Sequence, residues 1–204
     1  MHPLVSLALA YLIGSFPTAY LAGKAFGVDL RTVGSGNLGA TNVLRTLGAK
    51  VAAPVFLLDV AKGALPVLLL PRYTATAYPS RWAMAFGLAA IAGHMRPIYL
   101  RGKGGGKGVA TACGVFLALS PLPTLIALGV FAAVAAATGY VSLASVVAAA
   151  VLPVAVGMRE GLRDPVFALS VLVSGLVIWM HRANMGRLRR GEEHSLRRKG
   201  PAVR

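Results

Sequence analysis

One glycine-rich segment of this chain has the residue types and spacing of a phosphate-binding loop. Residues 34–45 read GSGNLGATNVLR, with three glycines in the first six positions that let backbone N–H groups approach an anion closely. A helix that starts behind such a glycine turn presents free N–H groups to a phosphate, and we expect a helix to begin near Gly39. The candidate substrate ligands in this segment are Ser35, Asn37, Thr41, Asn42 and Arg45.

A second segment, residues 101–107, reads RGKGGGK and combines glycines with cations. This composition suits a backbone nest for an anion with charge support. It is not a Walker A loop, which needs four residues between its first glycine and the Gly-Lys pair and then Ser or Thr; an NTPase is therefore disfavoured. The candidate ligands here are Arg101, Lys103, Gly104, Gly105, Gly106 and Lys107.

Two histidines lie close to polar segments and are candidate general bases. His94 ends an apolar run just before the second glycine segment, and His181 ends the last apolar run, three residues before Asn184. Their ordinary pKa suits proton transfer near neutral pH, although an oxygen of a substrate phosphate is a third alternative. A His-x4-Asp acyltransferase site is excluded, because position 99 is tyrosine.

Serine side chains complete the candidate site. Ser35 is a candidate catalytic residue, although no Ser-His-Asp set is visible. We expect Ser142, at the start of an apolar run, and Asn184 to orient the substrate or a histidine.

Three charged residues are assigned structural roles. Asp59 and Lys62 lie three positions apart inside an apolar run, where each charge alone would cost about 2.5–3.5 kcal/mol. We therefore expect them to form a pair that faces the interior of a helix bundle. Glu193 is expected to bind Arg187 or another cation.

The composition indicates a membrane protein. The chain is 56% hydrophobic and 13% charged, against about 25% charged residues in soluble domains. We predict an all-α polytopic fold of about seven transmembrane helices, with five as the alternative, and expect the first run to be a retained span rather than a signal peptide. The apolar runs are 3–23, 51–71, 82–100, 109–120, 123–139, 141–157 and 165–181.

The cations predict the orientation. In the seven-span arrangement with the N-terminus outside, 16 Lys and Arg residues fall in the segments 24–50 and 96–108 and after 181, and four fall on the other side. The positive-inside rule places the glycine-rich loops in the cytoplasm. Residues 1–185 are expected to form the transmembrane domain, and residues 186–204 a basic tail along anionic phospholipid. Nucleic acid is a poor partner for cations placed in short blocks between apolar runs, and one cysteine allows no disulfide and no zinc site of thiolates.

Taken together, residues 34–48, 58–66, 93–111, 140–145 and 181–193 resemble the PlsY family of bacterial membrane glycerol-3-phosphate acyltransferases. The resemblance implies transfer of an acyl group from acyl-phosphate to the 1-hydroxyl of glycerol 3-phosphate, seven helices, no metal or cofactor, and a donor supplied by the soluble protein PlsX. The sequence departs from the family pattern at three places: three glycines separate Lys103 from Lys107 instead of two, Arg96 replaces an aromatic residue, and Leu38 replaces a proline.

Two other functions remain as alternatives. A transporter for phosphorylated solutes would use similar cations but needs polar groups on both faces, whereas the sequence places almost all of them on one. A lipid-binding scaffold would need no catalytic side chains.

Overall fold

The computed structural model describes residues 1–197, and this part of the chain is helical without strands, as predicted. The last seven residues of the predicted basic tail lie outside it. The chain divides into two compact units, of which the first is Met1–Leu119 and the second begins at Ser120. The helices of the first unit are α1 (Pro3–Ser15), α2 (Thr18–Ala25), α3 (Ala40–Leu47), α4 (Ala49–Tyr73), α5 (Pro79–Met95), the short 3-10 helix η1 (Ile98–Leu100) and α6 (Val109–Leu119).

Glycines allow the helices of the first unit to pack at close range. A Cβ added at Gly14 of α1 would overlap the backbone of Ala90 in α5, and one added at Gly63 of α4 would overlap the carbonyl of Thr111 in α6. Small residues at such contacts are typical of membrane helices, which gain little from the hydrophobic effect and associate through close van der Waals contact. Within this unit, α1 packs most extensively against α5, and α4 against α6.

The first apolar run is broken, which the sequence analysis did not predict. Helix α1 ends at Ser15 and α2 starts at Thr18, because Pro17 has no N–H to continue the hydrogen-bond ladder. Together the two helices still form one candidate span of 23 residues, Pro3–Ala25.

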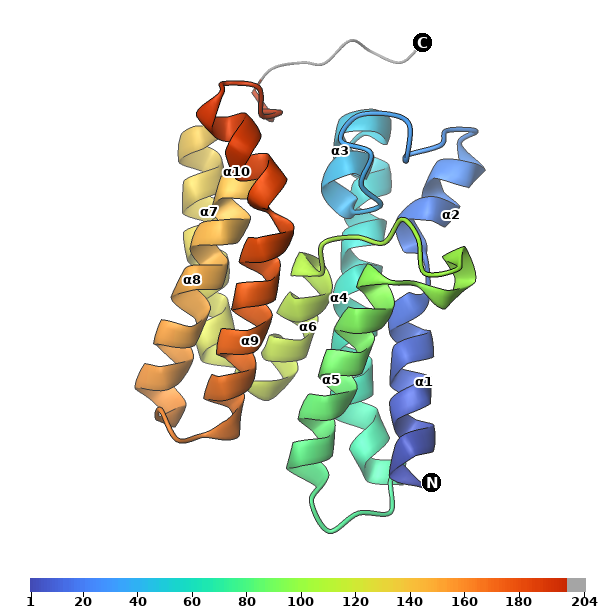
Figure 1. Cartoon of the computed structure of the whole chain (residues 1–204), viewed down its shortest axis with the longest axis vertical. Coiled ribbons are helices and arrows are strands. Elements are labelled where there is room, and N and C mark those ends of the chain that lie inside the picture. The colour runs from blue at the N-terminus through green and yellow to red at the C-terminus, as the bar shows by residue number, and fades with distance from the viewer. Residues whose placement is uncertain (198–204) are drawn as a thin grey trace. The chain divides into compact units, whose positions relative to one another are not determined.

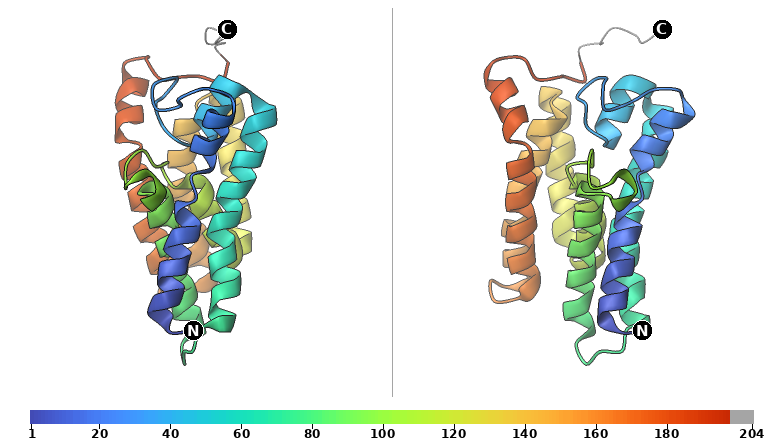
Figure 2. Two further views of the ribbon diagram at one scale, coloured as in Figure 1. Left: turned by 90° about the vertical axis from the view of Figure 1, so that its right-hand side faces the viewer. Right: turned by 45° about the vertical axis from the view of Figure 1, so that its right-hand side comes forward.

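Both glycine-rich segments lie at one end of the first unit (Figures 1 and 2). The N-terminus and the turn between α4 and α5 lie at the opposite end, where the backbone N–H of Ala75 donates to the carbonyl of Met1 at 2.9 Å. The predicted gathering of basic loops on one side therefore holds within this unit.

The second unit contains α7 (Pro121–Thr138), α8 (Val141–Glu160), α9 (Pro165–Met180) and α10 (Arg182–Arg189). Helix α8 packs against both α7 and α9. Helix α10 continues from α9 after a bend of 49° at His181 and runs through position 185, where we expected the transmembrane domain to end.

Each of the seven predicted apolar runs forms a helix or a broken helix, but the number of spans is smaller by length. Within the described part of the chain four helical segments are long and apolar enough to cross a membrane, and a fifth is obtained if α9 and α10 count as one span. Helix α6, with 11 residues, is too short to qualify. The membrane fold is confirmed, whereas the count of seven spans is not.

The glycines at helix contacts lead to a first prediction. Gly63→Ala and Gly114→Ala should each lower the thermal unfolding temperature in detergent, because the new methyl group meets a backbone carbonyl of the facing helix and overpacking costs about 1–3 kcal/mol. Gly129→Ala in α7 is the matched control, since a Cβ there meets no atom within 4 Å. Equal unfolding temperatures for all three variants would contradict the assigned contacts.

Candidate functional site

The first glycine-rich segment is shaped by the amide of Asn42, which is buried in α3. Its Oδ1 accepts a hydrogen bond from the backbone N–H of Ser35 at 2.9 Å. Its Nδ2 donates to the carbonyls of Leu30 at 2.9 Å and Val33 at 3.1 Å. We expected Asn42 to bind substrate, but both donors of its amide are used inside the loop, and it therefore shapes the loop that carries Ser35.

Helix α3 begins where the sequence predicted. Gly39 is the N-cap and α3 starts at Ala40, so Thr41 lies in the first turn and Arg45 one turn later on the same side. Ser35, Asn37, Thr41 and Arg45 are all partly exposed. The N-terminus of this helix has no side-chain cap.

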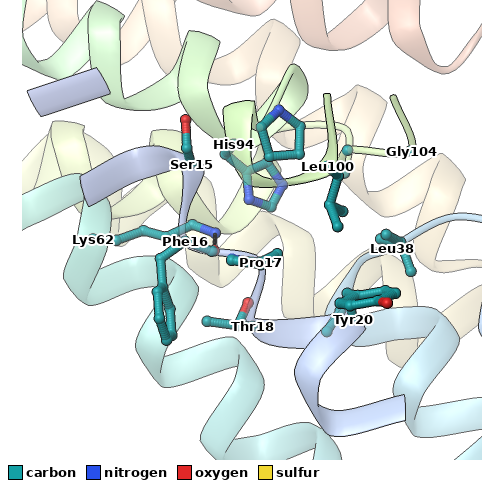
Figure 3. Close-up of a pocket in the computed structure, with 14 residues that line it drawn as sticks. Ser15, Phe16, Pro17, Thr18, Tyr20, Leu38, Lys62, His94, Leu100 and Gly104 are labelled. Atoms are coloured by element: carbon teal, nitrogen blue, oxygen red, sulfur yellow. Dashed lines mark hydrogen bonds between the residues drawn. The ribbon is translucent and has the colours of Figure 1, made fainter. Parts of the chain in front are cut away.

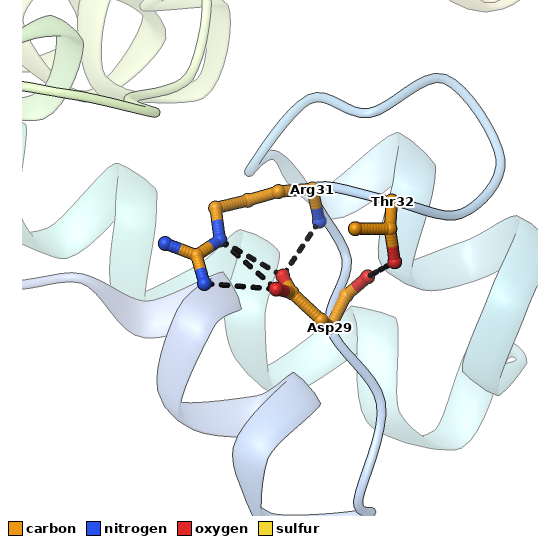
Figure 4. A network of polar contacts seen from close by, with 3 residues as sticks. All are labelled: Asp29, Arg31 and Thr32. Atoms are coloured by element: carbon orange, nitrogen blue, oxygen red, sulfur yellow. Dashed lines mark hydrogen bonds and ion pairs between the residues drawn. The ribbon is translucent and has the colours of Figure 1, made fainter.

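The cation that precedes this loop is already compensated by a carboxylate (Figure 4). Arg31 donates from Nε and Nη2 to Asp29 at 2.9 and 2.8 Å, and its backbone N–H donates to the same carboxylate at 3.0 Å. These hydrogen bonds, first from the side chain and then from the backbone of Arg31, lower the pKa of Asp29 to about 2. The guanidinium also lies over the ring of Tyr20, 5.6 Å from its centroid.

The second glycine-rich segment lies against the first. A Cβ added at Gly104 would be 3.6 Å from Leu38 Cδ1, and one added at Gly106 would be 3.1 Å from the Leu38 carbonyl oxygen. Gly104 has a φ of +70°, a conformation that favours glycine, and turns the chain after Lys103. The structure therefore brings the residues 34–45 and 101–107 together in one basic region of the first unit.

A small opening of about 10 Å³ lies beneath the second segment (Figure 3). The glycines 104–106 and Leu38 form one side of it, and the break between α1 and α2 forms another. The side chains of Lys62 and His94 reach it from α4 and α5.

The expected pairing of Asp59 with Lys62 is confirmed, and it includes groups that the sequence analysis missed. Lys62 Nζ is 2.7 Å from Asp59 Oδ1 and donates to the carbonyl of Phe16 at 2.9 Å. Thr18 Oγ1 donates to Asp59 Oδ1 at 2.6 Å. The sequence held a signal for these contacts, because Pro17 in an apolar run predicts backbone groups that need a partner.

His94, which we expected as a candidate general base, is surrounded by other groups of the protein. Its side chain is 6% exposed, and its Nδ1 lies 3.7 Å from Asp59 Oδ1. A Cβ added at Gly106 would overlap its Nε2. Both ring nitrogens therefore face groups of the protein.

The second unit holds a separate polar cluster around Glu193. Asn184 Nδ2 donates to Glu193 Oε1 at 2.7 Å, and Arg187 Nε donates to Oε2 at 2.9 Å. Burial would raise the pKa of the Glu193 carboxyl, but the interactions with Asn184, Ser142 and Arg187 outweigh it and hold that pKa below its usual value. The expected contact between Glu193 and Arg187 is confirmed.

His181, the residue that follows α9, has a defined tautomer in its neutral form. Its Nδ1 lies 2.8 Å from the carbonyl oxygen of Val177. A carbonyl only accepts hydrogen bonds, so Nδ1 carries the proton and Nε2 is the acceptor nitrogen. His181 therefore has the tautomer that a general base requires.

Within residues 1–197 no three His, Cys, Asp or Glu side chains gather in a way that could hold a metal ion. The acceptors and donors of the candidate site are instead backbone N–H groups, hydroxyls, amides and cations. Such a set binds and orients anions, and it can stabilise negative charge that develops on an oxygen.

Comparison with known proteins identifies the family. The family model for glycerol-3-phosphate acyltransferase matches residues 4–191. A glycerol-3-phosphate acyltransferase of Geotalea daltonii is 48% identical over 189 residues, which cover 93% of this chain and 95% of the relative. The protein of the same name from Synechococcus sp. is 48% identical over 202 residues, or 98% of each chain.

Solved structures agree with the sequence relatives. The glycerol 3-phosphate form of PlsY, an integral membrane glycerol 3-phosphate acyltransferase, is 40% identical with a TM-score of 0.87 and covers 95% of this chain and 94% of its own. Its lysophosphatidic acid form is 38% identical with a TM-score of 0.84 and the same coverage. The chain belongs to the glycerol-3-phosphate acyltransferase family represented by PlsY, and it is an integral membrane enzyme.

The role of Asn42 leads to a second prediction. Asn42→Ala should speed hydrogen exchange across residues 30–36, because the N–H of Ser35 and the carbonyls of Leu30 and Val33 lose their partner; each buried group left unpaired costs about 1–3 kcal/mol. Mass spectrometry of the exchanged protein in detergent measures this. Asn37→Ala, in the same loop, is the control and should leave exchange at Ser35 unchanged. Identical exchange in the two variants would show that Asn42 does not hold the loop.

Proposed function

We propose that this membrane glycerol-3-phosphate acyltransferase takes its acyl group from acyl-phosphate and transfers it to the 1-hydroxyl of glycerol 3-phosphate. The products are 1-acylglycerol 3-phosphate, a lysophosphatidic acid, and inorganic phosphate, as the first step of phospholipid synthesis. The observation that carries the proposal is the contact of the two glycine-rich segments at Leu38 and Gly106. It forms one anion-binding region on a bundle of apolar helices, which suits two phosphorylated substrates of which one carries an acyl chain.

Anion binding is assigned to specific groups of this region. Ser35, Arg45 and Lys103 are proposed to hold phosphate oxygens together with the backbone N–H groups of Gly104 and Gly105. The N–H of Gly106, which we also expected as a ligand, donates to the carbonyl of His94. Hydrogen bonds to charged groups contribute about 1.5–3 kcal/mol each, so a few of them are sufficient for micromolar to millimolar affinity. The remaining proposed substrate ligands are Asn37, Thr41, Arg101, Lys107, Ser142 and Asn184.

The chemical step needs little covalent help from the protein. The hydroxyl oxygen attacks the carbonyl carbon of acyl-phosphate, the bond from that carbon to the phosphate oxygen breaks, and phosphate leaves. Donors near the carbonyl oxygen stabilise the negative charge that develops there, and fixed positions for both substrates lower the entropic barrier. His181 is as buried as His94, at 4% against 6% exposure. It is the better candidate to accept the hydroxyl proton because its Nε2 is the acceptor nitrogen, whereas Nε2 of His94 faces Gly106; an oxygen of a substrate phosphate is the alternative.

We further propose a bacterial cytoplasmic membrane location with the N-terminus outside and the C-terminus inside. The distribution of cations supports it, because α2, α3 and the second glycine-rich segment, which carry Lys24, Arg45, Lys103 and Lys107, lie away from the N-terminus in the first unit (Figure 1), and positive residues favour the cytoplasmic side. A cytoplasmic site would be open to glycerol 3-phosphate and to acyl-phosphate delivered by a soluble PlsX protein.

The donor leads to a third prediction. Purified protein in lipid should release inorganic phosphate when it receives acyl-phosphate and glycerol 3-phosphate together, and it should not use acyl-CoA as a donor. Phosphate release and lysophosphatidic acid are measured by a colorimetric assay and by mass spectrometry. Transfer from acyl-CoA at an equal rate would overturn the assigned donor, and uptake of glycerol 3-phosphate into vesicles without acylation would support a transporter.

The phosphate ligands lead to a fourth prediction. Ser35→Ala and Arg45→Ala should each lower kcat/KM by about tenfold to a hundredfold, which corresponds to the loss of one hydrogen bond to a charged group. Lys24→Ala is the control, because it removes a cation from the same end of the unit without touching the two glycine-rich segments. Unchanged turnover of the Ser35 and Arg45 variants would remove the proposed phosphate site.

A further inference from the structure

The ring of His94 lies between a buried carboxylate and the second glycine-rich segment. On one side its Nδ1 is 3.7 Å from Asp59 Oδ1. On the other side its Nε2 faces Gly106 so closely that an added Cβ would overlap it. The backbone of the same two residues is also joined, since the N–H of Gly106 donates to the carbonyl of His94 at 3.2 Å.

Close approach explains why positions 105 and 106 are glycine. Neither is among the glycines with positive φ, so their backbone conformation would accept other residues. A Cβ at Gly105 would overlap the carbonyl of Met95 and lie 2.6 Å from that of His94, and a Cβ at Gly106 would overlap the His94 ring. The segment therefore rests directly on the C-terminal end of α5, with Gly105 against backbone carbonyls and Gly106 against the His94 ring.

The carboxylate that faces His94 is itself fixed. Asp59 is 1% exposed and is held by Thr18 Oγ1 at 2.6 Å and by Lys62 Nζ at 2.7 Å. Lys62 is also held by the carbonyl of Phe16. A buried ion pair with additional hydrogen bonds has one favoured geometry, so Asp59 offers the ring a defined position.

We propose that His94 is a positioning residue, seated between Asp59 and Gly106, that holds the second glycine-rich segment so that the backbone N–H groups of Gly104 and Gly105 are in the orientation that binds phosphate. This proposal rests on the proposed function, in which the second glycine-rich segment binds a substrate phosphate. His94 acts through the segment and transfers no proton, because its Nε2 is covered by Gly106 and a general base must reach the hydroxyl it deprotonates.

A double-mutant cycle tests the proposal, which is the fifth prediction. Gly106→Ala and His94→Ala should each weaken the binding of glycerol 3-phosphate by about tenfold or more, measured by calorimetry in detergent. In the His94→Ala background, Gly106→Ala should cause no further loss, because the methyl group occupies space that the imidazole has left. Coupling of this kind is expected only for residues in contact.

Gly105→Ala is the matched control. Its methyl group meets backbone carbonyls of His94 and Met95, which His94→Ala does not remove. The loss caused by Gly105→Ala should therefore persist in both backgrounds. His94→Asn, which keeps a polar side chain of smaller size, serves if the alanine variant does not fold, and it should recover part of the affinity.

Kinetics separate positioning from proton transfer. A positioning role raises KM for glycerol 3-phosphate and leaves the pH profile of kcat unchanged in the variants. Unchanged affinity with a lower kcat and an altered pH profile would make His94 the base and overturn the proposal. Additive losses for His94→Ala and Gly106→Ala would overturn it as well.

Hydrogen exchange keeps this test separate from the proposed function. If the wild-type protein did not bind glycerol 3-phosphate, the proposed substrate would be wrong, and exchange across residues 101–108 would still report on the contact. Faster exchange in both single variants, with no further increase in the double variant, supports the contact between the second glycine-rich segment and the His94 ring. Exchange that does not respond to His94→Ala overturns it.

Discussion

The buried carboxylate of Asp59 organises the first unit, because a charge inside an apolar bundle must be surrounded by partners. Removal of one partner from a buried ion pair costs about 3–5 kcal/mol, and here the partners come from different elements: Thr18 starts α2, Lys62 lies on α4, and His94 ends α5. Lys62 in turn satisfies the carbonyl of Phe16 where α1 ends. The break in the first span and the C-terminal end of α5 therefore both contact the Asp59–Lys62 pair on α4.

The glycines of the site have two different physical roles. Gly104 is needed for its positive φ, whereas Gly105 and Gly106 are needed because the backbone lies against α5. This distinction bears on the run of three glycines between Lys103 and Lys107. A change of loop length is best absorbed at the turn of Gly104, since the two positions that follow have no space for a side chain.

Much of the fold could be predicted from the sequence, because apolar runs of sufficient length form helices in lipid whatever their neighbours are. The start of α3 behind Gly39 and the pairing of Asp59 with Lys62 were also predictable, since a glycine turn and a spacing of three residues are local signals. The break at Pro17 was not, because a proline in an apolar run is compatible with a kink as well as with two helices.

The candidate site could be predicted in its residue types more than in their individual roles. Asn42 was a plausible phosphate ligand, and only the positions of Leu30, Val33 and Ser35 show that its amide shapes the loop. The environment of His94 depends on Gly106, in the loop that follows α5, and on Asp59 of α4. No local sequence pattern indicates contacts between residues so far apart in the chain. The phosphate-binding roles of Ser35 and Arg45 are still predictions.

The ion pair of Asp29 with Arg31 has a consequence for the approach of anions. With its pKa near 2, the Asp29 carboxylate stays ionised throughout the physiological range and compensates Arg31 at every relevant pH. The long-range field that draws an anion toward this end of the unit then arises from the remaining cations, among them Arg101 and Lys103. Such steering acts on the association rate and weakens as salt shortens the Debye length, so encounter with a phosphorylated solute is governed by ionic strength rather than by the protonation of this pair.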